Sequence, residues 1–247
     1  MPEPVKVNVV SYGGVKPGQV VVGNGADGER TFLFNPDTDT VATEYLFRDL
    51  NLPTEWTADL PNLTKGKYMF HSCKGLKSFA ASLHSMTSAQ SMFRECTALE
   101  SFRADLGSLT TGGTMFVNCS KLASFESDLS GMTTGYEMFY GCSSLTSFES
   151  DLRSLTEGSE MFKNCTKLAS FRAGPQGLKS LTNGRQMFIG CKLDSASVQH
   201  ILETINPDVS AGAITIGVDA SKVSQEQQDT FDAGFLAKNW TVTWQRN

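Results

Sequence analysis

The sequence predicts a right-handed β-solenoid, in which short parallel strands stack from coil to coil, and three observations support this fold class. Rare residues recur at a fixed interval, apolar residues fall in fixed columns of the repeat, and one segment of each repeat alternates apolar and polar residues. A fixed period of this kind is the sequence signature of a repeat architecture. We therefore expect each repeat to form one coil that buries its apolar edge only by stacking on its neighbours.

The six cysteines give the interval directly. They stand at residues 73, 96, 119, 142, 165 and 191, and a Met-Phe dipeptide starts four residues before each of them. Aligned on this dipeptide, the unit reads MFxxCxxLxSFxxDLxSLTxGxx, and a degenerate copy with Phe47 and Trp56 precedes the first one. About seven coils of 23 residues are thus predicted across 46–193.

Two columns of aromatic residues form the predicted core. One holds the Phe of each MF dipeptide, and the other holds the Phe of each SF dipeptide, with Trp56 in the first copy. Around SF the alternation has a period of two, so that Phe148 points inward while Ser147, Glu149 and Asp151 face solvent. Each coil therefore contributes a short strand, and the stacked strands make a parallel sheet with a step of about 4.8 Å.

The motif MFxxCxxLxSF, followed by a polar turn and SLTxG, resembles the BspA-type leucine-rich repeat over about 46–193. The period also falls in the leucine-rich-repeat size class. The resemblance implies a leucine-rich-repeat solenoid that acts as an adhesive or interaction module and has no catalytic residues. Repeats of this type are found on the surfaces of host-associated bacteria and in phage-derived loci.

The two flanks are predicted to cap the solenoid, because an open end would expose core and unpaired strand edge. Residues 1–45 contain three β-rich runs, VKVNVV, QVVVG and TFLF, which indicate a β-rich N-terminal cap or small subdomain. Residues 194–247 predict an α/β C-terminal cap. It contains a helix begun by Asp194, a strand from Ile214, a second helix with a capping box at Ser224, and a final strand from Trp240.

Composition excludes several kinds of partner. The net charge is −5 and no basic block is present, so nucleic acid is not an expected partner. No apolar run approaches 20 residues and the first 20 residues lack a leader pattern, so we expect no membrane insertion. The location is expected to be the cell surface or outside the cell if a leader was trimmed, and otherwise the cytoplasm or a virion.

The cysteines and histidines do not indicate a metal site or a catalytic site. Cysteine ligands of zinc usually come in pairs two to four residues apart, whereas the shortest spacing here is 23 residues. The cysteines are therefore interpreted as buried free thiols that pack beside Phe and Met. Asp37 and Asp39 are reminiscent of a calcium loop but lack its glycine and final glutamate. No catalytic motif accompanies the three histidines, so the sequence predicts neither an enzyme nor a metal or cofactor.

Two surfaces are candidates for ligand binding. The first is the polar face of the predicted strands, where charged residues of successive coils stand in rows: Arg103, Glu126, Glu149 and Arg172 in one, Asp105, Asp128 and Asp151 in the next. Glu126 and Glu149 are expected to repel each other, with Arg103 and Arg172 flanking them. The alternative is a solvated charge ladder, whose aspartates only hold the turn after each strand through hydrogen bonds to the backbone.

The second surface, the aromatic face, is the side of the coils around the MF dipeptides, where residue type varies between copies. The varying column reads His71, Arg94, Val117, Tyr140, Lys163 and Ile189, and Tyr68 and Tyr136 stand just before two of the dipeptides. Exposed aromatic rings suit the recognition of a carbohydrate or an apolar protein patch, although drift at exposed positions explains the same variation. The low charge and the three tyrosines favour this face.

The sequence thus predicts a non-enzymatic module that binds a protein or carbohydrate ligand. Two biological settings remain open. One is adhesion to, or recognition of, a host or microbial macromolecule at a bacterial surface. The other is a structural or receptor-binding accessory of a phage or prophage particle.

Overall fold

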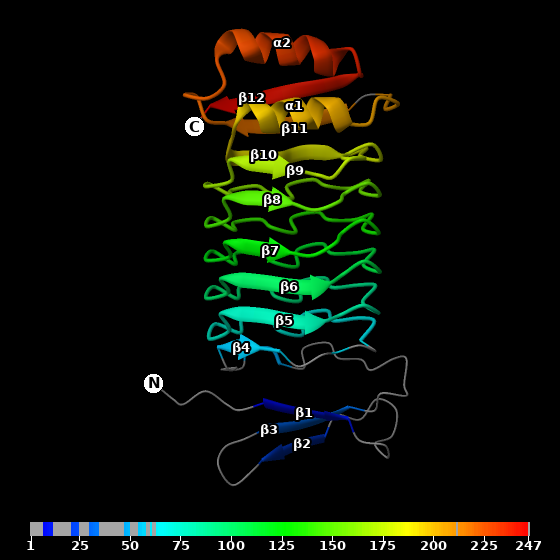
Figure 1. Ribbon diagram of the computed structural model, residues 1–247, viewed down its shortest axis with the longest axis vertical. Helices are drawn as coiled ribbons and strands as arrows, with labels where there is room; N and C mark the ends of the chain where they lie inside the picture. The colour runs from blue at the N-terminus through cyan, green and yellow to red at the C-terminus, as the bar shows by residue number, and fades with distance from the viewer. Residues whose placement is uncertain are drawn as a thin grey trace.

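A computed structural model describes residues 7–11, 21–24, 30–34, 47–49, 54–57, 60, 63–210 and 212–246. The chain forms a solenoid, with strands β5 to β9 lying one above another along the long axis (Figure 1). This arrangement confirms the predicted fold class. The number of coils stays a prediction, because part of the first predicted coil lies outside the described residues.

One face of the solenoid is built from the SF segments. The strands are β4 (Glu55–Trp56), β5 (Ser78–Ser82), β6 (Ser101–Asp105), β7 (Ser124–Glu126), β8 (Ser147–Glu149) and β9 (Ser170–Arg172). Each paired strand is parallel to the next and is shifted by one 23-residue repeat, as in Phe79 opposite Phe102. The phenylalanines are buried and their neighbours are at least partly exposed, so the predicted alternation is confirmed. We call this surface the strand face.

A second ladder runs along another side of the solenoid. Isolated parallel bridges link equivalent residues of successive coils, from Lys65 to Ser88 and onward to Asn183. The ladder then becomes a parallel sheet of β10 (Gly184–Leu193), β11 (Gly212–Val218) and β12 (Trp240–Arg246), with register shifts between β10 and β11. In the last copy of the repeat the MF dipeptide therefore lies in a strand, whereas in the preceding copies it lies in turns.

The aromatic columns form a continuous stack through the core. Rings of the MF column lie 5.0–5.6 Å apart and nearly parallel. Rings of the SF column meet them edge to face at 4.8–5.8 Å, as Phe148 meets Phe162. Both geometries are favourable for aromatic pairs beyond the gain from burial. All these side chains are at most 9% exposed.

All six cysteines are buried free thiols, as predicted. Each Sγ donates to the backbone carbonyl of a Phe one coil earlier, at 3.0–3.2 Å, as Cys119 does to Phe93. Burial raises the pKa of the Cys119 thiol far above its usual range, so the thiol stays protonated and can donate. Cysteine is thus a small apolar residue that also satisfies a buried carbonyl.

The MF turns have an unusual backbone. The residue before each dipeptide and the residue three after its Met adopt positive φ, as at Ser91 (55°) and Glu95 (62°) or Thr114 (58°) and Asn118 (60°). Such a conformation costs about 1–2 kcal/mol for a residue with a side chain. Hydrogen bonds to the next coil offset this cost, since the amide of Glu95 donates to the carbonyl of Val117 at 2.8 Å.

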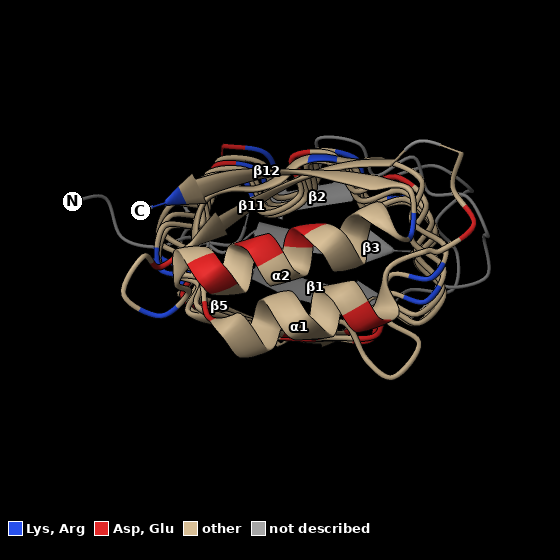
Figure 2. Ribbon diagram, turned by 90° about the horizontal axis from the view of Figure 1, so that it is seen from above, with Lys and Arg blue, Asp and Glu red and all other residues tan. Residues whose placement is uncertain are grey.

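The flanking elements match the predicted runs. Strands β1 (Val7–Ser11), β2 (Val21–Asn24) and β3 (Arg30–Phe34) form a three-stranded sheet, with β1 parallel and β2 antiparallel to β3. At the other end, α1 (Ser195–Thr204) and α2 (Gln225–Leu236) lie side by side (Figure 2), with α1 against β9 and α2 against β12. The predicted N-cap at Asp194 and capping box at Ser224 are both present. The boundaries at 45 and 193 stay predictions, and β10 pairs with β11 across the second.

Helix α1 covers the open edge of β9. The Ser197 hydroxyl accepts from the amide of Phe171 at 3.0 Å, and Nε2 of His200 accepts from the amide of Ala173 at 3.0 Å. Two side chains thereby replace the next strand of the ladder. Because Nε2 is an acceptor, His200 must be unprotonated at that atom. Desolvation, and then the charge of Arg172, lower the pKa of His200, although Glu203 raises it.

The buried aromatic stack yields a first prediction. Phe148→Ala should lower the free energy of unfolding by about 3–5 kcal/mol, because it removes a central ring with neighbours on both sides. Leu236, which is 71% exposed, provides the control, and Leu236→Ala should have little effect. Urea denaturation measures both. Equal midpoints for Phe148→Ala and the parent would contradict the assignment of this column to the core.

The edge contact of His200 yields a second prediction. The folded pKa lies below the unfolded value of about 6.5, so the unfolded chain binds the proton first. The stability that His200 contributes is therefore present above the unfolded pKa and is lost as the pH falls below it. His200→Gln keeps an acceptor that does not titrate. Thermal melts should show a shallower loss of stability in this variant between pH 7 and pH 5, and identical slopes would contradict the assigned role.

Candidate functional site

The strand face carries the first set of predicted site residues. Arg103 lies opposite Glu126 in adjacent strands, and Glu149 lies opposite Arg172. Arg103, Glu126 and Glu149 are all exposed. Within the described part of the chain, the side chains of Arg103 and Glu149 have no hydrogen bond or ion pair, and the carboxylate of Glu126 has only a long contact of 3.5 Å from the Ser124 hydroxyl. These three charges are therefore available to a ligand.

Arg172 differs from the other three residues of its row. Its Nη1 donates to the carbonyl of Phe171 at 2.8 Å and to that of Ala196 at 3.4 Å. The second contact joins the guanidinium to α1. The sequence interpretation treated Arg172 as a counterpart of Arg103, but the structure uses it to attach the helix to β9.

The ladder of the strand face is interrupted at its middle. Strands β4 to β7 form one sheet, and β8 and β9 form another. At the other junctions the amide of the strand's first serine donates to the preceding coil, as Ser124 does to Glu100 and Ser170 to Thr146. Among the described residues, the amide of Ser147 has no such bond to the preceding coil.

The break coincides with a pair of like charges. Cross-strand neighbours of the same sign destabilise a pairing, and Glu126 and Glu149 are the like-charged neighbours of their row. The Phe125 and Phe148 rings beside them are 6.0 Å apart, against 5.7 and 5.6 Å at the two neighbouring junctions, so the aromatic column changes little at the break. Just after the two strands, the Ser150 hydroxyl donates to the carbonyl of Ser127 at 2.8 Å and links the two coils.

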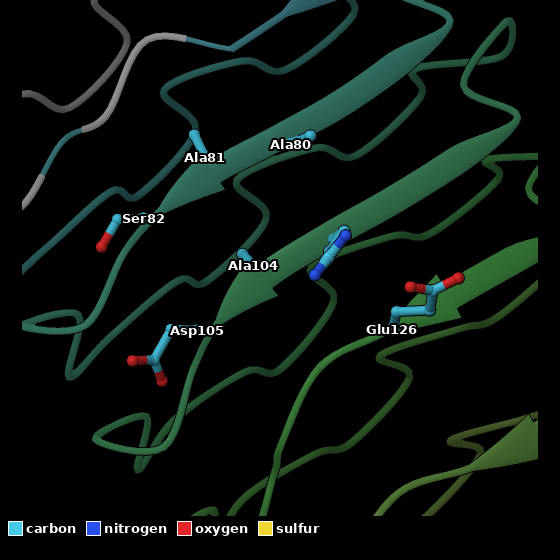
Figure 3. A pocket seen from close by; sticks show the side chains of 7 residues that line it. Ala80, Ala81, Ser82, Ala104, Asp105 and Glu126 are labelled. Atoms are coloured by element: carbon cyan, nitrogen blue, oxygen red, sulfur yellow. The ribbon is translucent and has the colours of Figure 1, made fainter.

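The strand face contains two hollows. The larger, about 510 Å³, spans β5 to β7 and has Arg103, Asp105 and Glu126 around a floor of small residues. It exists because β5 has Ala80 and Ser82 where the next strand has Arg103 and Asp105 (Figure 3). Sequence reasoning missed these two small residues, although their departure from the charged rows was the available signal.

The smaller hollow, about 330 Å³, lies at the break between β7 and β8. Ser124, Glu126, Ser147 and Glu149 line it, with Phe125 at its base. It is thus the direct result of the opening between the two sheets. Both hollows of the strand face contain residues of the charged row.

The aspartate row serves the turns. Asp105 accepts from the amide of Gly107 at 3.2 Å, Asp128 from that of Ser130 at 2.9 Å, and Asp151 from that of Arg153 at 2.9 Å. The Arg153 side chain also donates to Asp151, and its hydrogen bond holds the pKa of that carboxyl below its usual value. These hydrogen bonds are the ones that the alternative interpretation gives to the aspartates.

The three tyrosines of the aromatic face make contacts within the protein. Tyr136 lies against Gly113, where an added Cβ would come within 2.4 Å of its ring, and its hydroxyl accepts from Nε2 of Gln90 at 2.8 Å. Tyr140 lies 5.7 Å from Nζ of Lys163. Tyr68 stands 5.7 Å from the ring of His71. No contact among the described residues brings these three tyrosines together.

The column that includes Tyr140 is less exposed than the sequence suggested. His71, Tyr140 and Lys163 are half-buried, and Val117 is only 3% exposed. Part of the variation in this column therefore reflects packing. Nδ1 of His71 is buried with no hydrogen-bond partner, and desolvation lowers the pKa of this histidine.

Other kinds of site are not indicated in the described ranges. They contain no grouping of three His, Cys, Asp or Glu that would suit a metal ion. Neither described helix has the length and apolar character needed to cross a bilayer. Asp37 and Asp39, the residues considered for calcium, lie outside the described residues.

Comparison with known proteins identifies the repeat. The family model for the BspA type leucine rich repeat region matches residues 36–111 and 93–215, with six copies. The chain belongs to this family. No curated protein sequence matches it. The crystal structure of a leucine-rich repeat protein from Bacteroides ovatus is similar to 88% of the chain, with 14% identity and a TM-score of 0.44, and this chain spans 48% of that protein.

Membership of the BspA-type leucine-rich-repeat family supports a protein-interaction module. Repeats of this family and fold are typically non-enzymatic binding modules. The question that remains is which surface of the solenoid binds, and what it binds.

Proposed function

We propose that this protein is a non-enzymatic binding module that recognises a protein through its strand face. The observation that carries the proposal is the charged row of Arg103, Glu126 and Glu149, which is exposed, lacks strong partners and lines two hollows. Charges placed in this way give an interface specificity and speed its association more than they raise its affinity.

The aromatic face has less support. Tyr136 is engaged by Gly113 and Gln90, and Tyr140 by Lys163, so these rings stabilise the stack of coils. The two hollows described above lie over β5 to β8, and neither is lined by a tyrosine. We therefore favour the strand face, in contrast to the preference that the sequence alone suggested.

The biological setting we propose is adhesion or recognition at a bacterial surface. It follows from the family, whose repeats are regarded as adhesive or interaction modules. The alternative, an accessory of a phage particle, uses the same binding surface. Labelling intact cells with an antibody to the chain separates the two settings, because only a surface protein is stained without permeabilisation.

A third prediction tests the binding surface. An array of host and microbial proteins and glycans, probed with the purified chain, provides the binding partner. Glu149→Lys should weaken that binding by about tenfold at low ionic strength, because an exposed attraction becomes a repulsion. The effect should shrink in 0.5 M salt, where the Debye length is only a few ångströms.

Tyr140→Ala is the matched comparison on the other face, and it should leave the affinity unchanged. If Tyr140→Ala removes binding while Glu149→Lys has no effect, the ligand occupies the aromatic face and the strand-face proposal is wrong. Circular dichroism of both variants verifies that the fold is intact.

A further inference from the structure

We propose that the strand face over β5 to β8 binds an α-helix of a partner protein. Successive turns of that helix would present an acidic residue to Arg103 and basic residues to Glu126 and Glu149. This inference rests on the proposed function and adds the partner's secondary structure and the order of its charges.

The order of the charges comes from the row itself. Arg103, Glu126 and Glu149 occupy equivalent positions of β6, β7 and β8, so the row reads positive, negative, negative along the solenoid axis. A partner with bases alone would place one of them against Arg103, where like charges cost free energy. The complementary order is acid, base, base.

The spacing of the row favours a helix. Arg103 and Glu126 are cross-strand neighbours in the parallel pair of β6 and β7, and neighbouring strands of a sheet lie about 4.8 Å apart. Residues on one side of an α-helix recur about every 5.4 Å, the helical pitch. Same-face residues of a β-strand recur about every 6.6–6.8 Å, so a strand would fall out of register sooner.

The break between β7 and β8 adds polar groups to the row. The smaller hollow at the break is lined by Ser124 and Ser147 as well as by Glu126 and Glu149. Two neighbouring basic side chains can therefore enter it, and each finds a carboxylate.

The larger hollow offers the next position of the docked helix. One coil before Arg103, the equivalent position of β5 is occupied by Ala80. Ala81 and Ala104, the next pair of the same ladder, help to form an apolar floor. The turn of the partner helix that precedes the acid would place an apolar side chain here. The full pattern is then apolar, acid, base, base at one-turn intervals.

The test uses two synthetic helical peptides of identical composition, each held helical by side-chain lactam bridges. One presents Leu, Glu, Lys and Lys at successive turns, and the other presents Leu, Lys, Glu and Lys. The second order remains a mismatch over the three charges when the helix is reversed. Binding is measured by titrating each peptide into the isotopically labelled protein and following amide shifts by nuclear magnetic resonance.

The first peptide should bind about five- to thirty-fold more tightly at low ionic strength, since two contacts change from attraction to repulsion in the second. The amide shifts should centre on β6, β7 and β8. Equal affinities, shifts centred elsewhere, or no binding of either peptide would overturn the proposal.

A charge-order variant provides the stricter comparison. Arg103→Glu combined with Glu126→Arg keeps the net charge but changes the row to negative, positive, negative. This variant should prefer the second peptide. Lys192→Glu combined with Glu203→Lys exchanges two exposed charges away from the row and should keep the parental preference.

The two proposals fail separately. If Glu149→Lys weakens binding of the array-selected partner but the peptides are not discriminated, the strand face binds something other than this helix and only the present inference is wrong. If Glu149→Lys has no effect and the peptides do not bind, both proposals are wrong.

Discussion

The structure depends on the stacking of equivalent side chains from successive coils at a spacing of about 5 Å. The MF and SF rings meet their counterparts and one another at this distance, and each cysteine thiol satisfies a carbonyl of the preceding coil. A coil without neighbours would expose both aromatic columns and keep two strained residues in its turn. Stability is therefore a property of contacts between coils, as in other solenoids.

The same constraint explains the candidate site. Side chains that face inward must be nearly identical in every coil, whereas the exposed positions of the strand face are free to change. Arg103, Glu126 and Glu149 use this freedom, and the like-charged pair marks the point at which β7 and β8 separate. The aromatic stack continues through the break, with Phe125 and Phe148 still in contact distance at 6.0 Å. The core thus tolerates a local opening on the surface that we propose binds the partner.

The sequence predicts much of this fold, because the strict period shows which residues contact their counterparts in the next coil. A single copy of the repeat would not show these contacts. The burial of Phe148 and the register of the strands follow from the period, and the caps at Asp194 and Ser224 have local signatures. The break in the sheet could not be predicted, since it depends on a balance between like-charge repulsion and backbone hydrogen bonds. The roles of Arg172 and Tyr136 depend on contacts with α1 and with a coil two repeats away.

Amide hydrogen exchange, followed by nuclear magnetic resonance under native conditions, tests the central claim most directly. The amides of Ser124 and Ser170 donate to the preceding coil at 3.2 and 3.3 Å, but that of Ser147 does not. Local opening sets the exchange rate of a bonded amide. The Ser147 amide should therefore exchange faster than the other two while Phe148 at its side remains protected. Equal protection of all three serine amides would show a continuous sheet and would contradict the account.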